Sequence, residues 1–403
     1  MFVDLFVSPL DVDWSTEGDE LLHHMWLILH ERIPITGYSY QQHPPTESEP
    51  NFYFGCRPAS DVLTSELALV PQRDGKIRAF VGVTSPDQIP SQVQPWADAI
   101  IEAAGRLSAG HPEHHWFAMV GPTGDRARGA QVLTSGGSVG GMTVHPATSA
   151  YLDAKDPRSF PRLSGFNYDV SFPVVVEGWS RGYDWSTASE SAAADLTTLC
   201  ALLSLAFGAC WRLRDAPDER DEPIRPPRSR FGSDAFPKTD DNWSREKVTF
   251  PEWAVKAWEA LQSQPPLGIA LHAYQQGLDL MEAFPSYALL AFVGAIEGIG
   301  AMSEPLRRCE CCPNCSIKIG SARRFRRTLQ LVLSRKEANE LSDVYEYRSQ
   351  TAHEGRLHGD ELSRGTGGGA RVFTPRPASD AFRYQTVWKM RAAAQQLLLH
   401  HLS

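Results

Sequence analysis

The sequence predicts an α+β protein, in which a mixed α+β domain precedes an all-α bundle. Short runs of β-branched and aromatic residues alternate with helical patterns over roughly the first 180 residues, whereas helical patterns dominate from Pro251 onward. Between these regions lies a stretch that is rich in proline and in charges of both signs. We therefore expect residues 1–214 to form an α+β domain of unassigned role, 215–250 a connector, and 251–403 a helical domain.

The N-terminal region contains three runs that are typical of strands and three that are typical of helices. The expected strands are 76–83, 114–121 and 168–178, each bounded by glycine, proline or aspartate. The expected helices are 19–33, 91–107 and 191–215, the last with the small-residue stripe of a buried helix.

The C-terminal region contains successive helical patterns that indicate a bundle. Its first helix begins with a proline, which is favourable in a first turn. The expected helices are 251–262, 265–284, 285–302, 321–334, 335–349 and 379–402.

Composition and charge limit the compartment and the partners. The 403 residues carry a formal net charge of −9, so nucleic-acid binding would have to come from a local basic patch. The N-terminus lacks the basic region of a secretory signal, and the apolar runs are too short or carry an acid, such as Glu297. Seven cysteines, an odd number, do not resemble a secreted disulfide framework. We expect a cytoplasmic protein without a membrane span, with Cys56, Cys200 and Cys210 as small buried residues.

The segment Tyr345–Gly359 places an arginine and a histidine where a helix is expected to give way to a loop. Arg348 and His353 lie five positions apart, and Gly355 follows them. A guanidinium binds phosphate oxygens with its forked N–H groups, and histidine exchanges a proton near neutral pH. The pair suits cleavage of an RNA phosphodiester without a metal, because one group can move a proton while the other stabilises charge. The spacing alone is common, and a solvated helix end is the alternative.

The context of this pair resembles the HEPN superfamily, and the Apea-like HEPN domains in particular. The shared pattern is an arginine followed by a small polar residue, a short spacer and a histidine, within a helical bundle. Arg348, Ser349 and His353 match these positions, and Glu297 lies in an apolar helix upstream, as an acid does in many members. The resemblance covers residues 265–401 and implies a metal-independent endoribonuclease with these four catalytic residues. A local pair with an arginine is the alternative role for Glu297.

The same resemblance implies partners. RNA would be the substrate, and two chains would form a homodimer with composite sites. The apolar helices at Tyr287–Met302 and Val387–Leu402 either supply the dimer contact or fill the core of one chain. The setting would be bacterial defence or growth control, in a toxin–antitoxin or antiviral system. The N-terminal domain would then sense a phage trigger or a regulatory protein, or restrain the nuclease. The alternative is a catalytically inactive HEPN scaffold that binds nucleotide or a protein partner.

A cysteine cluster precedes the basic part of the helical domain. Its members, in the sequence CECCPNC, are Cys309, Cys311, Cys312 and Cys315. Two overlapping C-x2-C spacings favour a structural zinc ion, which would pin a loop between two helices and take no part in catalysis. Four ligands within seven residues are crowded, however, so free thiols and a redox disulfide stay open as alternatives.

A strongly basic stretch follows. Residues 305–335 contain eight lysines and arginines and one glutamate, a local charge of +7. Four of the arginines occupy adjacent turns of one expected helix, namely Arg323, Arg324, Arg326 and Arg327. A solvated helix face is the ordinary explanation of such a run. Next to a candidate nuclease site, we expect it to attract RNA phosphates.

Three further patterns do not indicate a site. Residues 136–140 fit the G-x-S-x-G motif of hydrolases, but a strand-like run follows where that motif requires a helix, so a glycine-rich hairpin or loop is expected. His111, His114 and His115 are expected to be loop histidines beside a strand and not metal ligands. His358 is likewise expected to be a loop histidine and not a second base.

Overall fold

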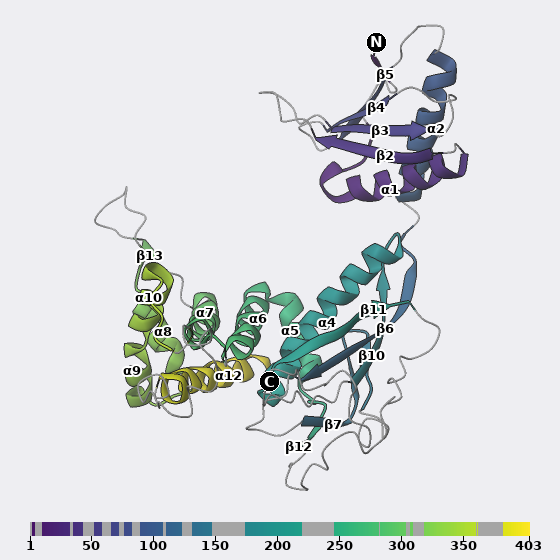
Figure 1. Cartoon of the computed structure of the whole chain (residues 1–403). Helices are drawn as coiled ribbons and strands as arrows, with labels where there is room; N and C mark the ends of the chain where they lie inside the picture. The colour runs from purple at the N-terminus through teal and green to yellow at the C-terminus, as the bar shows by residue number, and fades with distance from the viewer. Residues whose placement is uncertain are drawn as a thin grey trace. The chain divides into compact units, whose positions relative to one another are not determined.

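The chain folds as an α+β protein that divides into two compact units, Met1–Pro112 and Glu113–Ser403. The structure, a computed structural model (Figure 1), describes the following residues. They are 2–4, 10–32, 35–42, 52–58, 66–71, 76–82, 89–107, 110–122, 131–146, 174–219, 246–281, 283–303, 307–308, 318–359, 361 and 382–403.

The first unit contains an antiparallel five-stranded sheet and two long helices (Figure 1). The spatial order of its strands is β1-β5-β4-β3-β2, and every neighbouring pair is antiparallel. The strands are β1 (Phe2–Asp4), β2 (Ile35–Gln42), β3 (Phe52–Pro58), β4 (Glu66–Pro71) and β5 (Ile77–Gly82). The helices are α1 (Trp14–Arg32) and α2 (Ile89–Leu107), so α1 begins five residues before the expected 19–33.

One core holds the first unit together. Alternate residues of β5, Ile77, Ala79 and Val81, are fully buried, which is the pattern of a strand with one covered face. The same core contains Met25 of α1 and Trp96 of α2, so both helices contribute to a single hydrophobic cluster with the sheet. This cluster shares no member with the core of the second unit.

The second unit begins with another antiparallel sheet, of strand order β11-β6-β10-β9-β8. Its strands are β6 (Glu113–Pro122), β8 (Gly137–Val139), β9 (Met142–Val144), β10 (Val174–Arg181) and β11 (Trp211–Asp218). A separate parallel pair joins β7 (Gln131–Ser135) to β12 (Glu246–Thr249). Because β12 lies near the end of the expected connector, this pair joins that part of the connector to β7. Residues 220–245 of that connector lie outside the described residues.

Helix α4 (Trp185–Phe207) packs on this sheet. Asp184 caps its start by accepting a hydrogen bond from the Thr187 N–H at 2.8 Å, and Gly208 ends it at φ 64°. The expected helix 191–215 therefore ends at Phe207, and its expected last residues, from Trp211 onward, belong to β11. Cys200 and Cys210 are buried free thiols, as predicted. Burial, together with nearby Cys210, raises the pKa of the Cys200 thiol.

The helices that follow form the rest of the unit. They are α5 (Ala254–Ser263), α6 (Pro265–Leu280), α7 (Pro285–Ser303), α8 (Ser321–Leu329), α9 (Arg335–Asp343), α10 (Tyr345–Glu354), the π-helix η5 (Phe382–Val387) and α12 (Trp388–Leu402). The single helix expected at 335–349 is split at Val344 into α9 and α10. The two-residue strands β13 (Arg307–Arg308) and β14 (Lys318–Ile319) pair between α7 and α8.

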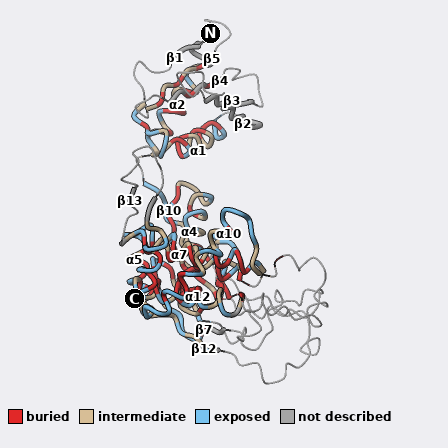
Figure 2. The backbone as a smooth tube through the Cα atoms, turned by 90° about the vertical axis from the view of Figure 1, so that its left-hand side faces the viewer, coloured by how far each residue is buried: buried red, intermediate tan, exposed pale blue. Residues whose placement is uncertain are grey.

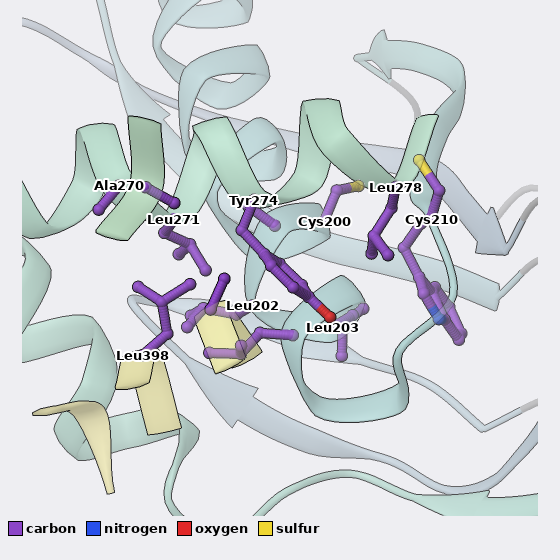
Figure 3. Close-up of a cluster of buried hydrophobic side chains, with 14 of the residues drawn as sticks. Cys200, Leu202, Leu203, Cys210, Ala270, Leu271, Tyr274, Leu278 and Leu398 are labelled. Carbon is purple, nitrogen blue, oxygen red and sulfur yellow. The ribbon is translucent and has the colours of Figure 1, made fainter. Parts of the chain in front are cut away.

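A continuous core joins the sheet to these helices, and this explains where the units divide. The core cluster runs from Trp116 of β6 to Leu402 of α12. Figure 3 shows its middle, where Tyr274 of α6 lies among Leu202 and Leu203 of α4 and Leu398 of α12. The division therefore falls after Pro112 and not within 215–250.

Buried residues run through α4 and α7 in particular (Figure 2). Within the described chain, α4 and residues Pro285–Met302 of α7 are long and apolar enough to span a membrane by length and composition alone. At least half of each searched window is buried inside the protein, so this similarity is weak evidence for a span. Both helices also belong to the core cluster, and α12 does too. The helices at 287–302 and 387–402 thus fill the core of one chain, the second of the two roles expected for them.

The glycine-rich segment 136–140 forms a β-hairpin of β8 and β9, as predicted. Its glycines allow aromatic side chains to approach the backbone. A Cβ atom on Gly137 would lie 2.3 Å from the Phe250 ring, and one on Gly140 would lie 2.3 Å from the Trp258 ring. Gly140 also has a φ of 59°, which favours glycine. Packing therefore accounts for these glycines, and the strand β9 follows them where a nucleophile elbow requires a helix.

Candidate functional site

Helix α10 carries the Arg348 and His353 pair, and it ends at Glu354, five residues beyond the expected helix 335–349. Gly355 takes a left-handed conformation at φ 66° and caps the helix with an N–H bond to the Gln350 carbonyl. His353 lies in the last turn of the helix. The helix therefore places a proton-exchanging side chain close to a loop.

Glu297 on α7 joins two residues of α10. Its Oε1 accepts a hydrogen bond from the Tyr345 hydroxyl at 2.6 Å, and its Oε2 lies 3.0 Å from Arg348 Nη2. The structure thus brings together two of the four predicted catalytic residues across 51 positions of sequence. The local pair with an arginine, the alternative stated for Glu297, is present. We name Tyr345, Glu297 and Arg348 the polar cluster.

The polar cluster is half-buried and tightly coupled. The side chains of Arg348 and Glu297 are 24% and 18% exposed, so the pair is neither a surface ion pair nor a fully desolvated one. The Arg348 guanidinium also lies 5.6 Å from the centre of the Tyr345 ring, at cation–π distance. Burial, followed by the hydrogen bond to Glu297, raises the pKa of Tyr345, so its hydroxyl stays a donor at neutral pH.

His353 differs from Arg348 in its surroundings. It is exposed, and it makes no hydrogen bond or ion pair within the described chain. Residues five apart on an α-helix point about 140° away from each other. Arg348 and His353 of one chain therefore do not share one face of α10. Ser349, the fourth predicted catalytic residue, is half-buried beside Arg348.

Helix α8 brings its arginines next to the polar cluster. Its Phe325 ring lies 5.2 Å from the Tyr345 ring, and Thr328 approaches α7 so closely that a Cβ on Gly300 would lie 2.4 Å from its hydroxyl. Gly300 is three residues after Glu297, about one turn along α7. Figure 1 shows α8 and α10 on the side of α7 opposite to α6. The basic helix is therefore a neighbour of the candidate site.

The four arginines of α8 are not equivalent. Arg323, Arg326 and Arg327 are exposed, whereas Arg324 is half-buried, with its aliphatic chain against Gly300. Arg326 donates from Nε to the Ser342 hydroxyl at 3.1 Å, which links α8 to α9. The three exposed arginines can contact a phosphate backbone without any change in the packed core.

The loop after α10 is fastened to the start of α7. The Ser286 hydroxyl accepts from the backbone N–H groups of His358 and Gly359, at 2.8 and 3.3 Å. The Glu361 carboxylate accepts from the Ser286 N–H at 2.5 Å and so caps the N-terminus of α7. We name the hydrogen bonds of Ser286 with His358, Gly359 and Glu361 the clasp. Because Glu297 meets the start of α10 and Ser286 meets the loop beyond its end, α7 and α10 run antiparallel.

His358 belongs to an aromatic group and not to the polar cluster. Its ring lies 4.7 Å from Tyr347 and 5.7 Å from Phe382. Burial and then the charge of Arg356 lower its pKa, against an opposing effect of Glu361. A neutral, packed loop histidine agrees with the role predicted for it.

The remaining predicted ligands fall elsewhere. Cys309, Cys311, Cys312 and Cys315 lie outside the described residues, and the strands β13 and β14 on either side of them in sequence pair with each other. Within the described chain, no group of three histidine, cysteine or acidic side chains can hold a metal ion. His111 contacts Glu20 at 3.0 Å and His114 contacts Glu219 at 3.0 Å. His114 and His115 lie in β6, within the strand expected at 114–121, and not in the loop beside it.

No protein-family model matches this sequence, and a search of curated proteins finds no significant match. The site is therefore defined by its own geometry. Two of its members were missed from sequence, Tyr345 and Ser286. Tyr345 could have been found from its place three residues before Arg348, since residues at that spacing lie on one helix face. Nothing in the sequence marks Ser286 as the acceptor for a loop 72 residues away.

Proposed function

We propose that the chain is a metal-independent endoribonuclease of the HEPN type. The observation that carries this proposal is the polar cluster, in which Glu297 and Tyr345 hold Arg348 at the surface of α7 and α10. The exposed His353 lies on the same helix, and the arginines of α8 lie beside it. A cation, a proton-exchanging group and a basic flank are the parts that cleavage of an RNA phosphodiester needs.

The reaction can be derived from these groups. The 2′-oxygen of the RNA attacks the adjacent phosphorus while the bond from phosphorus to the 5′-oxygen breaks, which leaves a 2′,3′-cyclic phosphate and a 5′-hydroxyl. A base removes the 2′-hydroxyl proton and an acid gives one to the leaving 5′-oxygen. His353 would supply one of these transfers. Arg348 would stabilise the charge on the equatorial phosphoryl oxygens.

One chain supplies too few groups for both transfers on one face of α10. The divergence of Arg348 and His353 by about 140° supports a composite site, in which a second chain contributes its own His353 or Arg348. The proposed active form is therefore a homodimer. Since α7 and α12 are occupied by the core, the contact would use surface residues, and exposed Tyr287 (44%) and Ile269 (69%) are the apolar ones on α7 and α6.

The first unit would regulate the nuclease in this proposal. Its separate core supports an independent role. Sensing of a phage component or of a regulatory protein, in bacterial defence or growth control, would account for a nuclease joined to a second unit. Removal of the first unit, Met1–Pro112, that leaves the rate of RNA cleavage unchanged would contradict this arrangement.

The deciding experiment incubates the purified chain with total RNA in the presence of EDTA. We expect cleavage by the wild-type chain, and loss of about 100-fold or more in the His353→Ala variant, the typical size of a general acid–base contribution. His400→Ala is the matched control, because His400 is also exposed near a helix end. It should leave cleavage unchanged.

Two outcomes would contradict the nuclease. The first is absence of cleavage by the wild-type chain with any RNA pool. The second is equal cleavage by wild type and His353→Ala at equal melting temperature, which would remove the assignment of that residue.

A second candidate function is a HEPN-like scaffold that binds nucleotide or a protein partner without cleavage. The observation that favours it is the internal pairing of Arg348 with Glu297, because a paired arginine can serve structure alone. A wild-type chain that binds RNA or nucleotide at the same residues but never cuts would decide for the scaffold.

A further inference from the structure

We propose that Glu297 is a built-in competitor of the substrate phosphate for Arg348, and that Tyr345 is a positioning residue that retains Glu297 when Arg348 changes partner. This inference rests on the proposed function, because it requires an RNA phosphate at Arg348. It concerns how the site is opened, and it makes neither Glu297 nor Tyr345 a proton carrier.

The contacts of Glu297 carry the inference. Its two oxygens have different partners, Tyr345 on Oε1 and Arg348 on Oε2. Tyr345 is held independently of both, because its ring packs against Phe325 of α8 at 5.2 Å. The carboxylate can therefore lose one partner and keep the other without any movement of α7 or α10.

The guanidinium of Arg348 keeps capacity for a second anion. Its contact with Glu297 uses Nη2, and its Nε is buried without an acceptor within the described chain, so a phosphate would meet the exposed part of the side chain. The side chain is 24% exposed, so an incoming phosphate can reach it from solvent. A phosphate and the carboxylate are both anions, and they compete for the same cation.

The energetic difficulty of this exchange lies with Glu297. Removing one partner of a half-buried ion pair leaves an uncompensated carboxylate, which opposes the exchange. The Tyr345 hydroxyl, a donor at 2.6 Å, lowers that cost because it continues to hydrogen-bond the charge. Loss of this hydroxyl should therefore tighten the hold of Glu297 on Arg348 and weaken phosphate binding.

The experiment is a double-mutant cycle on RNA affinity. The probe is a short fluorescein-labelled single-stranded RNA with every 2′-hydroxyl methylated, which binds but lacks the nucleophile. We expect Tyr345→Phe to weaken binding about tenfold, the size of one hydrogen bond to a charged group. We expect Glu297→Gln to tighten it about fivefold, because the competing charge is gone.

The cycle separates an exchange role from a structural one. When Glu297 is already glutamine, Tyr345→Phe should have little further effect, because the phenylalanine keeps the ring beside Arg348 and the lost hydroxyl reaches Arg348 through that carboxylate. Tyr347→Phe is the matched control on the same helix, since Tyr347 contacts His358 and Phe382 instead. Equal weakening by Tyr345→Phe in both backgrounds would overturn the exchange, as would a Glu297→Gln chain with unchanged or reduced affinity.

Cleavage of unmodified RNA by the wild-type chain, measured in parallel, tests the nuclease itself. If the effects of Tyr345→Phe and Glu297→Gln on RNA affinity are non-additive but the wild-type chain does not cleave, the proposed activity is removed and the exchange stands. If the wild-type chain cleaves but the two effects on affinity are additive, the exchange is overturned and the proposed activity stands. A wild-type chain that does not bind the probe would overturn the exchange outright. If Tyr345→Phe lowers the melting temperature too far for use, the gain expected from Glu297→Gln still decides.

Discussion

The β8–β9 hairpin and helix α10 both carry residue patterns associated with catalysis, G-x-S-x-G in the first and an arginine five residues before a histidine in the second. In the hairpin, Gly137 and Gly140 are explained by the Phe250 and Trp258 rings that lie against them. In α10, the capping role of Gly355 explains where the helix ends. It does not explain why an arginine and a histidine precede it.

The difference between these two regions shows how packing distinguishes residues that the fold requires from residues that it does not require. Where the glycines of a pattern lie against rings that leave no room for a Cβ atom, packing explains those glycines without a chemical role. Arg348 meets a carboxylate held by a second donor, and His353 meets solvent. Neither contact requires arginine or histidine for the fold. Substitutions in the two regions should therefore divide cleanly between stability and activity.

The largest effect is expected from Arg348→Ala. Loss of a cation that stabilises transition-state charge typically lowers the rate by about 100-fold or more. The free energy of unfolding should fall by only about 1 kcal/mol, because Tyr345 still hydrogen-bonds Glu297. Single-turnover cleavage and urea unfolding measure the two quantities. A loss of stability without loss of rate would place α10 in the same class as the hairpin.

The next effect is expected from Gly140→Ala. Its φ of 59° costs an alanine about 1–2 kcal/mol, and overlap with the Trp258 ring adds about 1–3 kcal/mol. Gly141→Ala is the matched control, since its φ is 79° but a Cβ there would meet nothing within 4 Å. Urea unfolding should show a larger loss for Gly140, with cleavage per folded molecule unchanged in both. Equal losses of stability in the two variants would mean that the Trp258 ring is not the reason for a glycine at position 140.

Much of the fold follows from sequence pattern. The runs at 76–83 and 114–121 became β5 and β6, because short runs of β-branched and aromatic residues bounded by glycine, proline or aspartate favour strands. The glycine-rich hairpin was also predicted. The boundary was not, because a proline-rich stretch marks an interruption of packing only where no core crosses it, and here Trp116 and Leu402 belong to one cluster.

The site was predictable only in part, for a similar reason. Arg348, His353 and Gly355 are close in sequence, so local pattern contains them. The bond from Tyr345 to Glu297 spans 48 residues and depends on how α7 meets α10. The split at Val344 was hidden as well, since the residues around it favour helix on both sides. Long-range polar contacts leave no periodic signal in a sequence.

A smaller effect is expected at the clasp, which attaches the end of α10 to α7. Ser286→Ala removes the acceptor of two backbone N–H groups and should cost about 1–3 kcal/mol of stability. Because His353 lies beside that end, we also expect a modest fall in cleavage rate. The exposed Ser263, whose hydroxyl bonds only the Ala260 carbonyl, gives the matched control Ser263→Ala. A full rate in the destabilised Ser286→Ala chain would show that the clasp serves the fold alone, as the hairpin glycines do.

The smallest effect is a dependence of stability on pH at His358, the histidine that packing explains. Burial, then Arg356, holds its folded pKa below the unfolded value of about 6.5. The unfolded chain therefore binds the proton first as pH falls, so stability present above pH 6.5 is lost below it. The His358→Gln chain should lose less stability than the wild-type chain between pH 8 and pH 5. Urea unfolding at each pH measures this difference. Three other histidines with lowered pKa, His24, His272 and His401, remain in both chains and cancel in the difference. Equal losses in wild type and variant would mean that His358 is not buried as a neutral ring, and it would then stand beside His353 as a candidate for proton transfer.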